Sequence, residues 1–98
     1  PIIESISKIA INSFNNEAEL VINRVTHSNF ESCVNSITKY FDFLNEELSV
    51  FNCKMNNAYL DLKVKELTIG FEYEQEEQKI KDQQAALKKQ VLQQLIQT

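Results

Sequence analysis

Residues that favour turns are almost absent from this sequence. Gly70 is the only glycine and Pro1 the only proline among 98 residues. A sheet protein needs many tight turns, and glycine and proline supply the backbone geometry of most of them. The chain can therefore form only a few long elements with few connections. This predicts an all-α fold, an antiparallel bundle of three helices.

Three segments carry apolar residues at the spacing of a helix. They cover residues 2–25, 29–51 and 58 onward. In each, apolar side chains recur at steps of three and four residues, which is typical of one buried helix face. The predicted faces, in chain order, consist of Ile3, Ile6, Ala10, Phe14, Ala18, Val21 and Val25; of Phe30, Val34, Ile37, Phe41, Leu44 and Leu48; and of Leu60, Val64, Leu67 and Phe71. Further apolar residues are expected to widen two of these faces: Ile9, Ile11, Leu20 and Ile22 in the first segment, and Tyr59, Leu62, Ile69 and Tyr73 in the third.

The connections between the segments contain helix-start signals. Ser28 and Glu31 have the spacing of a capping box, which predicts that the Ser28 hydroxyl caps the second helix. Asn56 or Asn57 is the predicted N-cap of the third helix. Three asparagines within residues 12–16 are poor helix interior, so one kinked helix and two short helices both fit the first segment.

The third helix is predicted to be longer than the other two. If it runs to Thr98, its roughly 40 residues span about 60 Å, against about 35 Å for each of the others. Its buried face stops at Phe71, and a polar run follows at 72–79. We therefore expect residues 1–73 to form the bundle and residues 74–98 to protrude from it.

Gly70 stands at this boundary inside a predicted helix. Glycine costs a helix interior about 1 kcal/mol relative to alanine. Its presence here indicates either the close approach of a neighbouring helix or a bend.

A second apolar stripe returns on the protruding part. It consists of Ile80, Leu87, Val91 and Leu95. A stripe this far along the helix cannot reach its own bundle, so it predicts contact with another chain in a two-stranded coiled coil. The expected partner is a second copy of the chain, which makes a homodimer. Parallel and antiparallel pairing both fit.

The sequence offers no catalytic, cofactor-binding or metal-binding constellation. His27 is the only histidine, and no nucleophile or carboxylate stands at a spacing that implies pairing with it. A zinc site needs about four ligands, more than one histidine and two separated cysteines provide. We expect Cys33 and Cys53 to be free thiols in a reducing, cytoplasmic compartment. The sequence shows no signal peptide and no apolar run of transmembrane length.

The charge pattern does not favour nucleic acid as the default partner. The net charge is −4, and the acidic residues gather at 72–77. The lysines of the third segment form three pairs: Lys63 and Lys65, Lys79 and Lys81, and Lys88 and Lys89. A solvated helix face is the simplest interpretation of these pairs. Phe43 lies off the buried face of the second segment and is the best candidate for an aromatic surface contact.

Three stretches of the chain resemble a known family. They are FNNEAELVINRVTHSNFES (residues 14–32), FDFLNEE (residues 41–47) and YLDLKVKELTIGFEYEQEEQKIKDQQ (residues 59–84). They are similar to uncharacterised helical domains of bacterial and phage proteins, which usually stand just before a GIY-YIG-type endonuclease domain. Some members of that family are implicated in defence against phage.

The resemblance implies a non-catalytic accessory domain that oligomerises and positions or regulates a downstream nuclease, or senses its target. The alternative is a helical module that binds nucleic acid itself. The sequence departs from the family in its glutamine-rich end and contains no GIY-YIG motif, so nuclease activity does not carry over. The chain begins without methionine and ends in a helical pattern. We therefore expect it to belong to a longer protein in which the nuclease domain follows.

Overall fold

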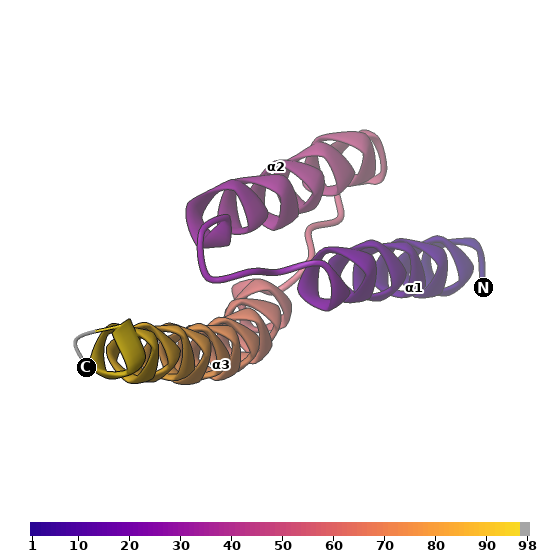
Figure 1. Ribbon diagram of the computed structural model, residues 1–98. Coiled ribbons are helices and arrows are strands. Elements are labelled where there is room, and N and C mark those ends of the chain that lie inside the picture. The colour runs from indigo at the N-terminus through magenta and orange to yellow at the C-terminus, as the bar shows by residue number, and fades with distance from the viewer. Residues whose placement is uncertain (97–98) are drawn as a thin grey trace.

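The computed structural model describes residues 1–96. Within that range the chain forms three α-helices and no β-strand: α1 (Ile2–Asn23), α2 (Phe30–Leu48) and α3 (Asn57–Ile96), with a 3-10 helix, η1 (Ser49–Phe51), directly after α2 (Figure 1). The predicted all-α fold is confirmed. Residues 12–16 lie inside α1, so the first segment is a single helix and not two short ones.

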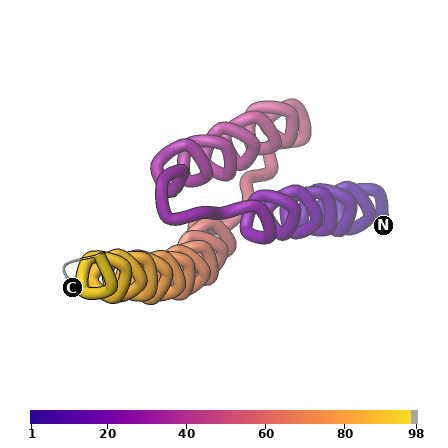
Figure 2. Tube along the Cα trace, in the orientation of Figure 1, coloured from indigo at the N-terminus to yellow at the C-terminus, as the bar shows by residue number. Residues whose placement is uncertain are grey.

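Consecutive helices run in opposite directions, as the traces in Figures 1 and 2 show. Phe30, at the start of α2, stacks on Phe71 of α3, with ring centroids 4.5 Å apart. Leu48, at the other end of α2, lines the same cleft as Ile6 near the start of α1. The helices therefore form the predicted antiparallel bundle, in which α1 and α3 run in the same direction.

The core lies between the three helices. Phe14 of α1 and Phe41 of α2 meet edge to face, with ring centroids 5.4 Å apart and planes inclined at 69°, an arrangement that aromatic pairs favour. The predicted faces supply most of the buried residues: Ala10, Phe14, Ala18, Val21, Val25, Ile37, Phe41, Leu48 and Leu67. Ile3 is exposed, because the first turn of α1 lies beyond the end of the core.

The expectation that flanking apolar residues widen two of the faces is largely wrong. Ile22 packs against the core, but the following are exposed: Ile9, Leu20, Tyr59, Leu62, Ile69 and Tyr73. Each helix of a three-helix bundle covers only one side of its neighbours, so an apolar residue just outside the contact stripe faces water. The third segment consequently carries an apolar face that its own bundle does not use.

The predicted capping box at the start of α2 is also wrong. The N-cap residue is Asn29, and no side chain makes a capping hydrogen bond there. The Asn29 amide instead ties the loop together: Oδ1 accepts from the Thr26 backbone N–H at 2.7 Å, and Nδ2 donates to the Arg24 carbonyl at 3.1 Å. The Ser28 hydroxyl lies 3.3 Å from that of Thr26. The loop is therefore closed toward the end of α1, and Ser28 does not reach the first turn of α2.

The second connection follows the sequence signals more closely. Asn52 ends η1 with a φ of 56°, in the left-handed region that asparagine tolerates better than most residues. The Asn56 side-chain oxygen accepts a hydrogen bond from the Ala58 backbone N–H at 2.8 Å. Asn56 is thus the cap of α3, one of the two residues predicted for that role.

Helix α3 continues without a break through Gly70 and leaves the bundle (Figures 1 and 2). The described chain measures 79 Å along its longest axis and only 17 Å and 16 Å across. All described residues from Lys79 to Ile96 are exposed, so this part of α3 does not fold back on the bundle. Thr98, where the predicted helix was to end, lies outside the described residues.

Candidate interaction surface

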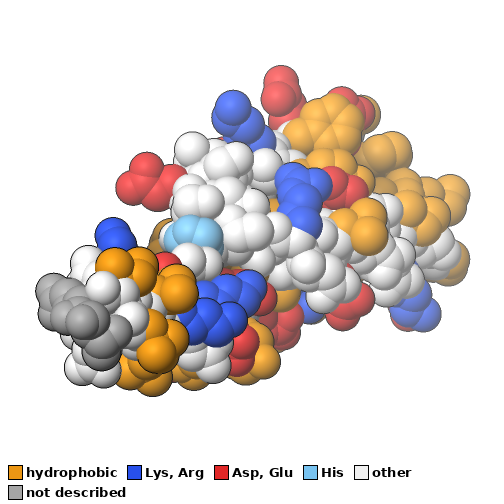
Figure 3. Space-filling view, in the orientation of Figure 1, with side chains coloured by type: hydrophobic (Ala, Val, Ile, Leu, Met, Phe, Trp, Pro, Cys, Tyr) orange, Lys and Arg blue, Asp and Glu red, His pale blue; other side chains and the backbone are white. Residues whose placement is uncertain are grey.

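The four residues of the predicted stripe lie on the part of α3 that projects beyond the bundle. The exposed fractions are 44% for Ile80, 61% for Leu87, 49% for Val91 and 68% for Leu95. Leu87 and Val91 line one shallow, almost wholly apolar depression together with Leu92. Figure 3 shows apolar side chains gathered at this end of the molecule. The structure thus presents an apolar surface where the sequence predicted one.

The stripe begins much earlier on α3 than the sequence suggested. Leu62, Ile69 and Tyr73 are exposed residues of the bundle half of α3. Successive steps from Leu62 through Ile69, Tyr73 and Ile80 are of seven, four and seven residues. Seven residues fall within about 20° of two full helical turns, and eleven within about 20° of three. These three residues therefore lie on the same side of α3 as Ile80.

We define the outer stripe as Leu62, Ile69, Tyr73, Ile80, Leu87 and Val91. Leu95 of the predicted stripe is not included, because it lies about 60° further round the helix than Leu62 and Ile80. The core residues of α3, Leu67 and Phe71, lie on the opposite side of the helix by the same 3.6-residue period. The signal was present in the sequence as the seven-residue spacing from Leu62 onward. Periodicity alone fits Leu62, Ile69 and Tyr73 equally well as a widening of the core face, so it does not decide between the two faces.

Lys63 is the buried charged residue of α3, and the expectation that the lysine pairs all lie on a solvated face is wrong for it. Its side chain is only 9% exposed. The ammonium lies 3.2 Å from Oε2 of Glu66 on the same helix and 3.9 Å from Oε1 of Glu19 on α1. The aliphatic stem covers apolar surface while the charge meets two carboxylates, a common compromise for lysine. Lys63 therefore helps to fix α1 against α3.

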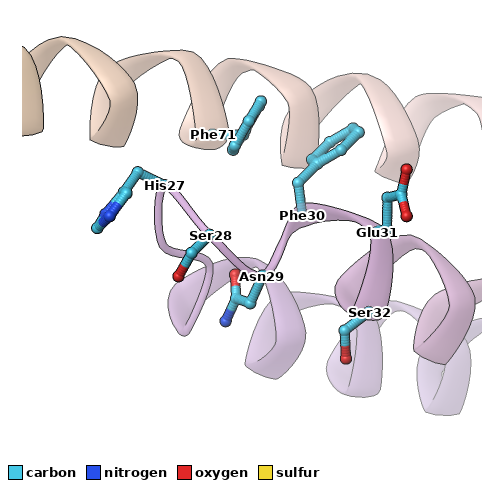
Figure 4. A pocket seen from close by; sticks show the side chains of 7 residues that line it. All are labelled: His27, Ser28, Asn29, Phe30, Glu31, Ser32 and Phe71. Atoms are coloured by element: carbon cyan, nitrogen blue, oxygen red, sulfur yellow. The ribbon is translucent and has the colours of Figure 1, made fainter.

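A hollow at the turn between α1 and α2 contains the histidine (Figure 4). It is lined by His27, Ser28, Asn29, Phe30, Glu31, Ser32 and Phe71. The stacked rings of Phe30 and Phe71 form one wall, and the His27 ring points away from them. No hydrogen bond among the described residues joins His27 to a hydroxyl or a carboxylate. The hollow thus lacks the contact between nucleophile and base that nucleophilic catalysis uses.

The two cysteines and the carboxylates form no cluster. Cys33 is buried in the core and Cys53 is partly buried, and both are free thiols. Within residues 1–96, no group of three or more His, Cys, Asp or Glu side chains is placed to hold a metal ion. No described helix has an apolar stretch suited to crossing a membrane, although α3 is more than long enough.

Two further apolar areas lie away from α3. Phe43 on α2 is about half exposed and stacks on Tyr40, with ring centroids 6.1 Å apart, so its predicted surface position is confirmed. A cleft between α1 and the end of α2 is lined mainly by apolar residues: Ile6, Ile9, Ala10, Ser13, Leu44, Glu47, Leu48 and Phe51. Ile9 at its rim is strongly exposed. Neither area continues onto the projecting part of α3.

Comparison with protein-family models gives one match, to the model described as SNIPE associated domain, over residues 1–79. Comparison with curated proteins and with solved structures found no match. The matched region contains the whole bundle and ends where the described residues of α3 become uniformly exposed. Because the match covers well over half of the sequence, the chain belongs to the SNIPE associated domain family.

Proposed function

We propose that this chain is a non-catalytic helical domain that holds two copies of a larger protein together through α3. The observation that carries this proposal is the outer stripe. Six large apolar side chains follow one side of a single helix, and no part of the described chain covers them. Exposed apolar residues aligned on one side of a helix are typical of protein–protein contact sites. The steps of seven and four residues along the stripe follow the heptad repeat of a coiled coil, although not every contact position of that repeat is apolar.

The partner domain that fits this role is a nuclease of the GIY-YIG type that follows α3 in the parent protein. Support comes from the resemblance of residues 14–32, 41–47 and 59–84 to helical domains that precede such nucleases. A long helix directed away from the bundle is suited to carrying a second domain at a fixed distance. In this proposal the bundle and α3 position or regulate the nuclease, or sense its target, in defence against phage.

The oligomeric state tests the first part of the proposal. Sedimentation equilibrium of the chain at micromolar concentration is expected to give twice the chain mass of 11.4 kDa. A monomer at all concentrations up to about 100 μM would contradict it. The sequence that follows Thr98 in the gene product tests the second part. A GIY-YIG motif within the next ~150 residues is expected, since domains are usually 100–150 residues long.

A second candidate function is direct binding of nucleic acid by the projecting part of α3. Between residues 79 and 96 four lysines stand against one acidic residue, Asp82, although the whole chain has a net charge of −4. An electrophoretic mobility shift at several salt concentrations distinguishes this function. Phosphate contacts would give an affinity that falls steeply as salt rises. Absence of any shift at low salt would exclude it.

A further inference from the structure

The outer stripe extends over both halves of α3, and this constrains how a second copy can cover it. From Leu62 to Val91 the stripe is about 44 Å long at 1.5 Å per residue. Its first half lies on the outer side of the bundle, opposite the core residue Leu67. Its second half lies on the projecting helix, with Ile80 and Leu87. The midpoint falls between Glu76 and Glu77.

We propose that two copies pair antiparallel about this midpoint, so that the projecting half of each α3 covers the bundle half of the other. This inference rests on the proposed dimer and adds its direction and register. Tyr73 then faces Ile80 of the second copy, and Leu62 faces Val91 of the second copy. Every large apolar residue of the stripe lies within the overlap. The projecting helix of one copy thereby becomes the fourth helix beside the other bundle.

The charges beside the stripe favour this direction. Glu72, Glu76 and Lys79 follow one edge, at steps of four and three residues. In an antiparallel pair each edge meets the same edge of the second copy. About the proposed midpoint, Lys79 of one copy therefore lies beside Glu72 and Glu76 of the other. Pairs of opposite charge at these flanking positions set the partner and orientation of coiled coils.

The other edge of the stripe agrees with this register. It carries Glu66, Glu77, Lys81 and Lys88. Lys88 of one copy lies beside Glu66 of the other, close to the carboxylates that already hold Lys63. At the midpoint Glu77 lies beside Glu77 of the second copy and, on the first edge, Glu76 lies beside Glu76. Lys81 and Lys79, about one turn away on each helix, offset these two repulsions.

Parallel pairing is less favourable, because each edge then meets the opposite edge of the second copy. Glu77 would lie beside Glu76 of the second copy, and Lys81 beside Lys79. Like charges at neighbouring positions destabilise a helix pair. An antiparallel pair formed only by the projecting parts places the two Lys88 side chains together. It also leaves Leu62 and Ile69 in water.

Distances between spin labels distinguish the three arrangements. The chain with Cys53→Ser serves as background, because Cys33 is buried and out of reach of the label. A label at Gln90→Cys lies far from the proposed midpoint, and a label at Gln75→Cys lies next to the midpoint. Both residues are exposed, so neither substitution disturbs the core. Circular dichroism of each labelled variant checks that its helix content is unchanged.

The proposed pair gives a long distance at position 90, about 40 Å from the 1.5 Å rise, and a short distance, under about 25 Å, at position 75. Pairing of the projecting parts alone reverses the two values. Parallel pairing gives short distances at both positions. Either of the last two patterns overturns the antiparallel register while the proposed dimer stands. A monomer in sedimentation would contradict the dimer itself. Failure of the register and failure of the dimer are therefore distinguishable.

Discussion

Gly70 of α3 lies directly against the side chain of Val25, two residues beyond the end of α1. A Cβ atom at position 70 would come within 3.3 Å of Val25 Cγ1, closer than an ordinary van der Waals contact. Of the two explanations for a glycine at this position, close approach is observed, because a side chain here would press on Val25. The backbone of α3 at Gly70 therefore comes close to the Val25 side chain.

Replacing Gly70 tests this contact. Alanine favours a helix over glycine by about 1 kcal/mol. Because the new methyl group presses on buried Val25, we expect Gly70→Ala to raise the free energy of unfolding by clearly less than this. In a Val25→Ala background the same substitution should recover the full gain. Urea unfolding of the four chains measures both steps. A gain of about 1 kcal/mol from Gly70→Ala alone would show that the contact is not tight.

Lys63 is expected to stabilise the bundle mainly through its stem. Lys63→Ala removes both the packing and the charge and should lower the free energy of unfolding by about 2 kcal/mol. Lys63→Met keeps most of the packing and removes only the ion pairs with Glu19 and Glu66, whose carboxylates are exposed and contribute little. Its loss should stay within about 1 kcal/mol, as measured by urea unfolding. Equal losses of unfolding free energy for Lys63→Ala and Lys63→Met would show that the stabilisation comes from the ion pairs of Lys63 with Glu19 and Glu66 and not from its stem.

The structure could be predicted from the sequence where a helix has only one possible apolar face. The seam of α2 is regular, and its buried residues Ile37, Phe41 and Leu48 follow from it, although α2 ends at Leu48 and the last three residues expected in it form η1. In α3 apolar residues lie on two faces, and periodicity alone does not say which one the bundle uses. Leu62 and Ile69 were therefore assigned to the core, although they face water.

Two local features depend on contacts that no sequence pattern specifies. Lys63 is buried, and its ammonium lies 3.9 Å from Glu19 of α1. Ser28 does not cap α2 because Asn29 bonds back to the end of α1. Of the candidate surface, the projecting residues Ile80, Leu87 and Val91 were predicted correctly as exposed, since a helix longer than its partners must leave them.

Substitutions along the outer stripe should weaken the dimer and leave the bundle folded. Leu87→Asp with Val91→Asp places two charges in a coiled-coil contact and is expected to give a monomer, since burial of each side chain stabilises by about 1.5–3 kcal/mol. Sedimentation velocity measures the mass. The melting temperature of the bundle, extrapolated to low protein concentration, should not change, because both residues project beyond it.

A matched pair of isoleucines tests whether the stripe includes the bundle half of α3. Ile69→Asp should raise the dimer dissociation constant at least about 30-fold, corresponding to about 2 kcal/mol. Ile9→Asp alters a residue of the same type and similar exposure, 65% against 67%, on the cleft between α1 and α2. It should have no effect on dissociation. If the two substitutions weaken the dimer equally, or if Ile69→Asp has no effect, the bundle half of α3 is not a specific part of the dimer contact.

The charge pattern gives a test by exchange. Lys79→Glu replaces attraction to Glu72 and Glu76 of the second copy by repulsion, and should weaken the dimer by about tenfold at low salt. Adding Glu72→Lys and Glu76→Lys to that variant restores opposite charges and should return most of the affinity. Sedimentation at two salt concentrations measures both steps. If the triple variant does not regain affinity, the edges of the stripe do not meet as the antiparallel pair requires.

The most direct test of the central claim, that α3 joins two copies through its outer stripe, is the molecular mass of the chain in solution. Sedimentation equilibrium across 1–100 μM should show reversible association from 11.4 kDa toward twice that mass. The Ile69→Asp chain should associate at least about 30-fold more weakly over the same range. A wild-type chain that stays monomeric at every concentration, or an Ile69→Asp chain that associates equally well, would contradict the claim.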